Sequence, residues 1–160
     1  GDSMGNSSVI KAGEIQVMSA GTGITHSEFN ASETDWGKFL QIWIFPRAKN
    51  LQSRYDQMAY EMNSDDIKTL VTPETKPEPG TLWIQQDAWI SRGKISAGNS
   101  IIYNIKKEGN GVFIFLIEGE ISINEKSLNR RDAIGISETS DVQISTKSES
   151  DILFIEVPMN

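Results

Sequence analysis

The sequence predicts an all-β fold, either a small closed barrel or a double-sheet jelly roll. Short runs rich in β-branched and aromatic residues follow one another along the 160-residue chain, and Gly, Asn, Asp and Pro separate them. Patterns with a helical period are few. The runs are most closely spaced in the second half, where eight of them occur within about 80 residues. This density is typical of a sandwich or barrel and not of a helical bundle.

Three runs before the first proline-rich stretch are candidate strands. Glu14–Met18 alternates polar with apolar residues and leads into the glycine-rich stretch Ser19–Gly23, so a strand that ends in a tight turn is predicted. Phe39–Phe45 reads FLQIWIF, a nearly continuous apolar run that Pro46 stops, and it predicts a buried strand. Lys68–Thr72 is the third candidate.

Residues 73–80 contain three prolines and one glycine, which no regular element tolerates. This stretch predicts a linker or a long loop. It divides the chain into residues 1–72, which hold too few strands to close a barrel, and residues 81–160. The first part is therefore expected to be the remainder of another domain.

The second part contains the closely spaced runs. A turn at Asn124–Lys126 predicts a hairpin with Ser127 and Leu128 in its second arm, and Glu118–Glu120 predicts the turn before it. Eight short strands suffice for a closed barrel or jelly roll. They are predicted at Thr81–Gln85, Trp89–Ile95, Ser100–Ile105, Val112–Ile117, Ile121–Asn124, Ala133–Ile136, Val142–Thr146 and Ile152–Val157.

Composition excludes several classes of function. The net charge of −7 argues against direct binding to nucleic-acid phosphates or to anionic lipid, because both require a basic surface. No apolar run approaches the roughly 20 residues that span a bilayer, and the first residues do not resemble a secretion signal, so a cytoplasmic location is expected. The absence of cysteine excludes disulfides, thiolate nucleophiles and zinc–thiolate sites.

His26 and Glu28 are the candidate metal ligands. In an extended segment residues i and i+2 point to the same face, so the imidazole and the carboxylate could converge on one ion. Mixed nitrogen and oxygen donors suit Fe(II), Mn or Ni. Because the chain has no other histidine, further donors would have to be carboxylates, waters or another chain. The alternative is a surface pair that forms only local hydrogen bonds.

Other polar patterns favour structural roles. Glu118 and Glu120 flank Gly119 in a predicted turn, which indicates solvated turn residues and not an acid–base pair. The four tryptophans lie mainly in strand-like runs, so packing explains them better than stacking on a ligand does.

Several of these stretches resemble the pirin family. Residues 13–28, GEIQVMSAGTGITHSE, resemble closely the stretch that closes the first cupin barrel of pirin-family proteins, including the quercetinase-like bacterial members. Residues 2–6, Phe39–Ile44, Gln86–Ala88 and Ile117–Ile121 are also similar to that family. The resemblance extends over essentially the whole chain.

The resemblance implies a bicupin with two jelly-roll barrels, the first of which holds a metal, commonly iron, through three histidines and one glutamate. His26 matches the last of these histidines and Glu28 matches the glutamate. The other two belong to an upstream His-x-His motif that this sequence lacks. The chain is therefore expected to be N-terminally truncated relative to the family. It would contain the tail of an incomplete N-terminal cupin barrel and a complete C-terminal cupin barrel without metal ligands.

The function implied for the intact form is that of a metal-dependent dioxygenase. It would use Fe(II) or another divalent metal and a small aromatic substrate of the flavonol type, with Glu28 as ligand or base. The present chain is expected to be inactive and to bind little metal. The alternatives are a non-catalytic, metal-responsive module that binds proteins or serves as a transcription cofactor, and an inert remnant. The incomplete barrel predicts a homo-oligomer formed through residues before about Asn50.

Overall fold

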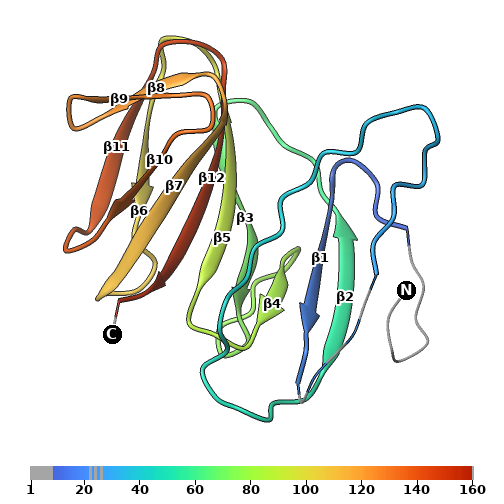
Figure 1. The fold of residues 1–160 in the computed structure, drawn as a ribbon. Coiled ribbons are helices and arrows are strands. Elements are labelled where there is room, and N and C mark those ends of the chain that lie inside the picture. Colours follow the sequence, from blue (N-terminus) through green and yellow to red (C-terminus); the bar gives the residue numbers. More distant parts are fainter. Residues whose placement is uncertain (1–8, 22, 24, 26, 160) are drawn as a thin grey trace.

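The computed structural model describes residues 9–21, 23, 25 and 27–159. These residues form strands and no helix, so the prediction of an all-β fold is confirmed (Figure 1). None of them belongs to a helix long and apolar enough to cross a membrane. The strands are β1 Glu14–Ser19, β2 Arg54–Ala59, β3 Asp66–Pro73, β4 Leu82–Ile84, β5 Trp89–Ile95, β6 Ser100–Asn104, β7 Asn110–Glu118, β8 Glu120–Ile123, β9 Lys126–Asn129, β10 Ala133–Ile136, β11 Asp141–Thr146 and β12 Ser150–Pro158.

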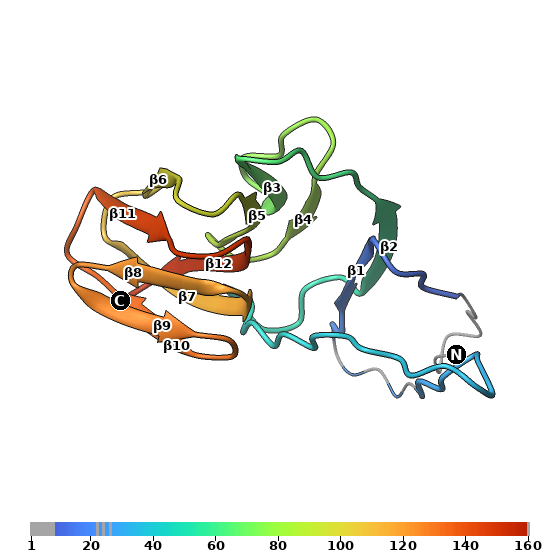
Figure 2. The ribbon, with the colours of Figure 1, turned by 90° about the horizontal axis from the view of Figure 1, so that it is seen from above.

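Two facing sheets form a jelly roll. One sheet has the order β10-β7-β12-β5-β3-β4 and the other has the order β6-β11-β8-β9. The two sheets face each other (Figures 1 and 2), and alternate residues of their strands meet between them in one apolar core. Tyr103 of β6 stacks on Phe154 of β12 across this core, with ring centroids 4.6 Å apart. The fully or almost fully buried residues of this core are Ile95, Tyr103, Val112, Ile114, Leu116, Ile121, Ile123, Leu128, Val142, Ile144, Ile152 and Phe154.

The eight strands predicted after residue 80 are all present, with ends within two residues of the predicted ones. The predicted hairpin is confirmed as β8 and β9, and Asn124 and Glu125 form its turn with positive φ angles of 46° and 68°. Asn tolerates this left-handed conformation better than most residues. In the β8–β9 hairpin the short turn sets the register of the pair.

Gly119 forms the turn predicted at Glu118–Glu120, and this turn crosses between the two sheets instead of closing a hairpin. It leads from β7 in the six-stranded sheet to β8 in the four-stranded one. Its φ is 105°, and a Cβ built on it would overlap Ser150 Oγ and lie 2.5 Å from the carbonyl oxygen of Glu149. Only glycine satisfies both conditions at this corner.

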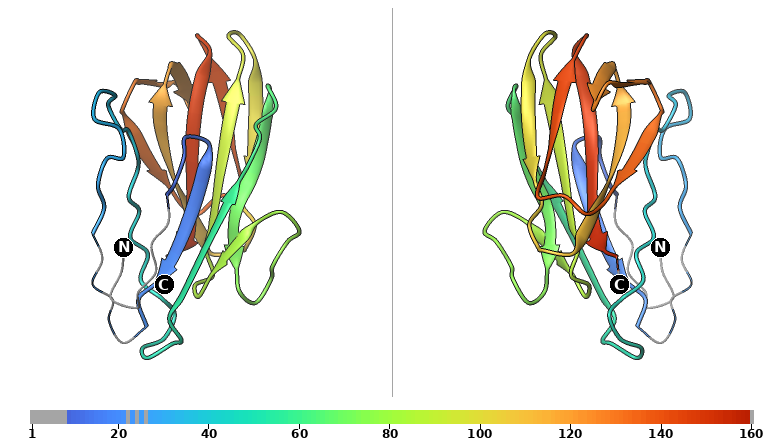
Figure 3. Two further views of the ribbon diagram at one scale, coloured as in Figure 1. Left: turned by 90° about the vertical axis from the view of Figure 1, so that its right-hand side faces the viewer. Right: turned by 90° about the vertical axis from the view of Figure 1, so that its left-hand side faces the viewer.

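β1 and β2 form a separate antiparallel ribbon that packs on the outer face of the six-stranded sheet (Figure 3). Ile15, Val17 and Met58 point toward the sheet and contact a small apolar cluster that includes Leu70 and Leu82. The strand predicted at Glu14–Met18 is thus confirmed as β1. β2 was not predicted from the sequence.

Residues 73–80 connect two neighbouring strands of one sheet. β3 pairs with β4 in parallel and with β5 in antiparallel fashion, so both ends of this connection lie in the six-stranded sheet. The stretch is therefore a long loop within that sheet and not a linker between separate bodies. The boundary proposed after residue 72 falls inside β3, and the sheet already begins at Asp66.

The prediction of a buried strand at Phe39–Phe45 is wrong. The segment forms no strand with any described residue, and Phe39, Trp43 and Phe45 are 72%, 83% and 89% exposed. Its C-terminal end is held by the amide of Gln86, which donates to the carbonyl oxygen of Phe45 at 2.8 Å. A buried strand needs a hydrogen-bonded neighbour and a covering layer. The described part of the chain supplies neither.

Candidate metal centre on the β1–β2 ribbon

A polar network covers the face of the β1–β2 ribbon that points away from the jelly roll. Gln16 of β1 lies opposite Gln57 of β2, and the Tyr55 hydroxyl lies 2.6 Å from Gln57 Oε1 and 3.2 Å from Gln16 Oε1. Gln57 Nε2 donates to Glu14 Oε2 at 2.8 Å. The alternation along both strands produces this arrangement, because residues that flank the partly buried Ile15 and the buried Val17 must point outward.

Glu28 joins this network from the loop after β1. Its Oε1 accepts a hydrogen bond from Gln16 Nε2 at 3.3 Å, and its side chain is exposed. The other predicted ligand, His26, lies outside the described residues. Convergence of His26 and Glu28 on one ion therefore stays a prediction, whereas the carboxylate of Glu28 has a defined neighbour on the outer face of the ribbon.

His26 and Glu28 would supply only some of the ligands that a metal site needs. Among the residues that the structure describes, no three His, Asp or Glu side chains gather closely enough to hold an ion. The chain has one histidine in total. An imidazole and a carboxylate would fill two positions around a divalent ion, whereas three or four protein ligands are usual.

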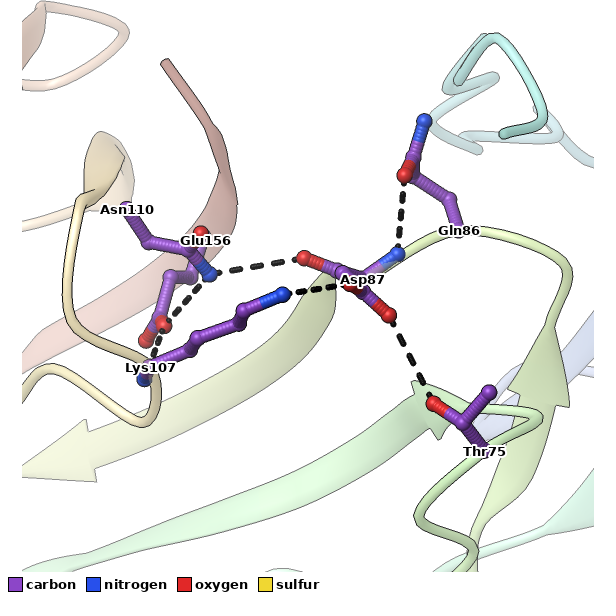
Figure 4. Close-up of polar contacts among 6 residues, drawn as sticks. All are labelled: Thr75, Gln86, Asp87, Lys107, Asn110 and Glu156. Carbon is purple, nitrogen blue, oxygen red and sulfur yellow. Dashed lines mark hydrogen bonds and ion pairs between the residues drawn. The ribbon is translucent and has the colours of Figure 1, made fainter. Parts of the chain in front are cut away.

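A second polar cluster lies around the loops that follow β4 and β6 (Figure 4). Asp87 forms an ion pair with Lys107, and Thr75 Oγ1 lies 3.5 Å from Asp87 Oδ1. The hydrogen bond from Lys107 keeps the pKa of Asp87 below its usual value. Asn110 Nδ2 lies 3.4 Å from the carbonyl oxygen of Asp87. These contacts tie the two loops together and leave the Asp87 carboxylate occupied.

Glu156 of β12 is the fully buried acid of this cluster. Its carboxylate accepts hydrogen bonds from the backbone N–H groups of Lys106 and Lys107, from the Tyr103 hydroxyl at 3.1 Å and from Asn110 Nδ2 at 2.9 Å. Burial, together with the Glu156 charge, raises the pKa of Tyr103. Glu156 therefore holds the β6–β7 connection against β12, which is a structural role.

A groove of about 820 Å³ lies beside this cluster. Its floor includes Phe113, Ile155 and Val157 from the outer face of the six-stranded sheet, and the exposed segment with Trp43 and Phe45 lies alongside. Figure 2 shows residues around 30–45 leaving the region of the ribbon and running toward the start of β7, whose Asn110 and Phe113 line the groove. The groove is mainly apolar in character.

Comparison with known protein families gives two matches. Residues 1–44 match the pirin family, and residues 70–157 match the quercetinase C-terminal cupin domain. The chain is 32% identical over 157 residues to a quercetin 2,3-dioxygenase from Escherichia coli, which covers 98% of this chain and 66% of the relative. It is 26% identical over 156 residues to a pirin-like protein from Caulobacter vibrioides, and this alignment covers 97% of this chain and 66% of the relative.

Solved structures agree with these matches. The crystal structure of YhhW from Escherichia coli superposes with a TM-score of 0.87 at 31% identity, covering 99% of this chain and 66% of that one. The structure of bacterial pirin YhhW in complex with nickel(II) gives a TM-score of 0.84 at 28% identity, covering 97% and 66%. The chain thus spans 66% of the length of these relatives. The fold and the family matches together establish that the chain belongs to the pirin family and contains its quercetinase-type C-terminal cupin domain.

Proposed function

We propose that this chain is part of a pirin-type, metal-dependent dioxygenase that acts on flavonol-type substrates, with His26 and Glu28 as two of the metal ligands. The observation that carries this proposal is the position of Glu28, whose carboxylate joins the polar face of the ribbon through Gln16. The similarity to quercetin 2,3-dioxygenase and to a nickel-binding pirin supports it. The remaining ligands would come from protein residues beyond those in this sequence.

The residues of this chain would hold the ion and orient the substrate beside it. A divalent metal, when bound, supplies a Lewis acid for an enol or phenol oxygen. The Glu28 carboxylate can serve as a ligand or as a base that accepts the proton of a substrate hydroxyl. Because the Glu28 side chain is exposed, a metal ion or a substrate hydroxyl can reach its carboxylate.

Metal content provides the direct test. Because two protein ligands seldom outcompete water and buffer, the chain loaded with Fe(II) and then dialysed should retain well below one iron per chain. The chain fused behind a segment that carries a His-x-His motif should retain about one iron and consume quercetin. In the fused protein, Glu28→Gln and His26→Ala should each weaken iron binding by about 100-fold or more.

Glu33→Gln, which changes another exposed carboxylate shortly after Glu28, is the matched control and should leave iron binding unchanged. Stoichiometric iron in the unfused chain would contradict the assignment of a partial site. Full iron occupancy of the fused protein without loss of quercetin would favour the second candidate, a metal-responsive protein-binding module. The exposed aromatic side chains of Trp43 and Phe45 are the observation that supports that candidate.

We also propose that copies of the chain associate through residues before about Asn50. Light scattering at high concentration should then give a mass of at least twice 17.8 kDa. The double substitution Trp43→Ser and Phe45→Ser should shift the mass to that of the monomer, because it removes two of the most exposed aromatic side chains. Ile102→Ser changes a 56% exposed residue of β6 in the four-stranded sheet and should leave the measured mass unchanged. A monodisperse monomer of the unsubstituted chain would rule out the association.

A further inference from the structure

The Tyr55 hydroxyl lies between two glutamine side chains, each of which leads to a carboxylate. On one arm, Gln16 Oε1 faces Tyr55 at 3.2 Å and Gln16 Nε2 donates to Glu28 at 3.3 Å. On the other arm, Gln57 Oε1 faces Tyr55 at 2.6 Å and Gln57 Nε2 donates to Glu14 at 2.8 Å. The two arms are built from the same groups but end at different carboxylates, and Gln57 Nε2 also donates to the carbonyl oxygen of Val9 at 3.0 Å.

The chemistry of these groups fixes the orientation of each amide. An ionised carboxylate can only accept, so each glutamine turns its Nε2 toward a carboxylate and leaves its Oε1 facing Tyr55. The single Tyr55 hydroxyl proton can be donated to only one of these two oxygens, and the contact with Gln57 is the shorter one. The backbone of Gln16 is also held in place, because β1 pairs with β2 and the neighbouring Val17 is buried. Gln16 thus presents an oriented N–H to Glu28.

We propose that Gln16 is a positioning residue for the Glu28 carboxylate. An exposed glutamate samples several rotamers, and holding it in one geometry before an ion binds removes part of the entropic cost. Partners of this kind around metal ligands typically contribute 10- to 100-fold in metal affinity. This role rests on the proposed function, since it assumes that Glu28 is a ligand.

The hydrogen bond is tested first, without metal. In the ¹H–¹⁵N spectrum of the chain, the side-chain amide resonances of Gln16 should shift in Glu28→Ala, because this substitution removes the carboxylate to which Gln16 Nε2 donates. Glu14→Ala is the matched control, since it removes the carboxylate at the end of the other arm and should move the Gln57 amide instead. If the Gln16 amide is unaffected by Glu28→Ala, the positioning role is overturned whatever the metal does.

The consequence for metal is tested with Mn(II), which broadens nearby resonances and so reports even weak binding. Titration should broaden backbone signals of β1 and of residues 27–29, and Glu28→Ala should abolish this effect. Gln16→Leu should raise the Mn(II) dissociation constant about tenfold, whereas Gln57→Leu should change it less than twofold. Equal constants for the two leucine variants would overturn the positioning role and leave the proposed function standing. If the Gln16 amide responds to Glu28→Ala but no broadening occurs near Glu28, the ligand assignment itself fails, and the role falls with it.

Discussion

Replacing Glu156 with alanine is expected to lower the free energy of unfolding by about 4 kcal/mol. The substitution leaves two backbone N–H groups, the Tyr103 hydroxyl and the Asn110 amide without their buried acceptor. Each buried donor that loses its partner costs about 1–3 kcal/mol, although some regain water at the loop. Urea denaturation followed by tryptophan fluorescence measures the change.

Two further variants show whether the buried position causes this effect. Glu156→Gln keeps one acceptor oxygen but turns an amide N–H₂ toward donors, so its loss should be about half as large. Glu108→Ala removes an exposed carboxylate from the same loop region and should change stability by less than about 0.5 kcal/mol. Equal stability of Glu156→Ala and Glu108→Ala would show that the hydrogen bonds to Glu156 contribute no net stability.

Gly119→Ala is expected to destabilise the jelly roll by about 3 kcal/mol. The added Cβ would overlap Ser150 Oγ and approach the carbonyl oxygen of Glu149, and a φ of 105° is itself unfavourable for alanine. Because the corner joins the two sheets, relief of the overlap would require movement of the start of β12. Chemical denaturation with the far-ultraviolet circular dichroism signal of the sheets is the appropriate measurement.

Gly135→Ala is the matched control for this prediction. Gly135 lies in β10, and nothing lies within 4 Å of the position its Cβ would take. The substitution should leave stability within about 0.5 kcal/mol or raise it slightly, because alanine restricts the unfolded chain. A similar loss in both variants would mean that the corner at Gly119 has no special requirement.

The second half of the chain was predictable because its local signals agree with its tertiary environment. Strands such as Glu120–Ile123 and Asp141–Thr146 alternate apolar with polar residues, and the structure places the apolar positions in one core. Turn residues such as Gly119 separate them at regular intervals. The strand ends are therefore marked by composition, and no long-range information is needed to find them.

β2 was missed because its inward and outward residues reverse the usual preference. Arg54 points toward the jelly roll, where its guanidinium lies 3.6 Å from the centre of the Trp83 ring and donates to the Trp83 carbonyl oxygen at 2.6 Å. Tyr55 points outward to the polar network. Because two charged residues accompany Met58 on the inner face and Tyr55 lies on the outer face, β2 has no period-two hydrophobic signal.

The sequence identified the candidate ligands but not the side chains around them. His26 and Glu28 stand out by type and spacing, and the resemblance to pirins assigned their roles. Gln16 and Tyr55 are ordinary polar residues in sequence, and only the pairing of β1 with β2 brings them together. The failed prediction at Phe39–Phe45 has the same origin. Apolar composition indicates that a segment is stabilised by burial, but it does not indicate which other segment packs over it.

The docking of the β1–β2 ribbon has a consequence for motion. A two-stranded ribbon is marginal on its own, and this one is held mainly by a small apolar cluster and by the stacking of Arg54 on Trp83. We therefore expect the ribbon to detach more readily than the jelly roll opens, and hydrogen exchange should show lower protection for its amides than for those of the jelly roll. Because the polar network lies on the face that points away from the jelly roll, an ion held by Glu28 should stabilise the pairing of β1 with β2 and not the docking of the ribbon, so occupancy should slow exchange of the β1 and β2 amides without slowing detachment.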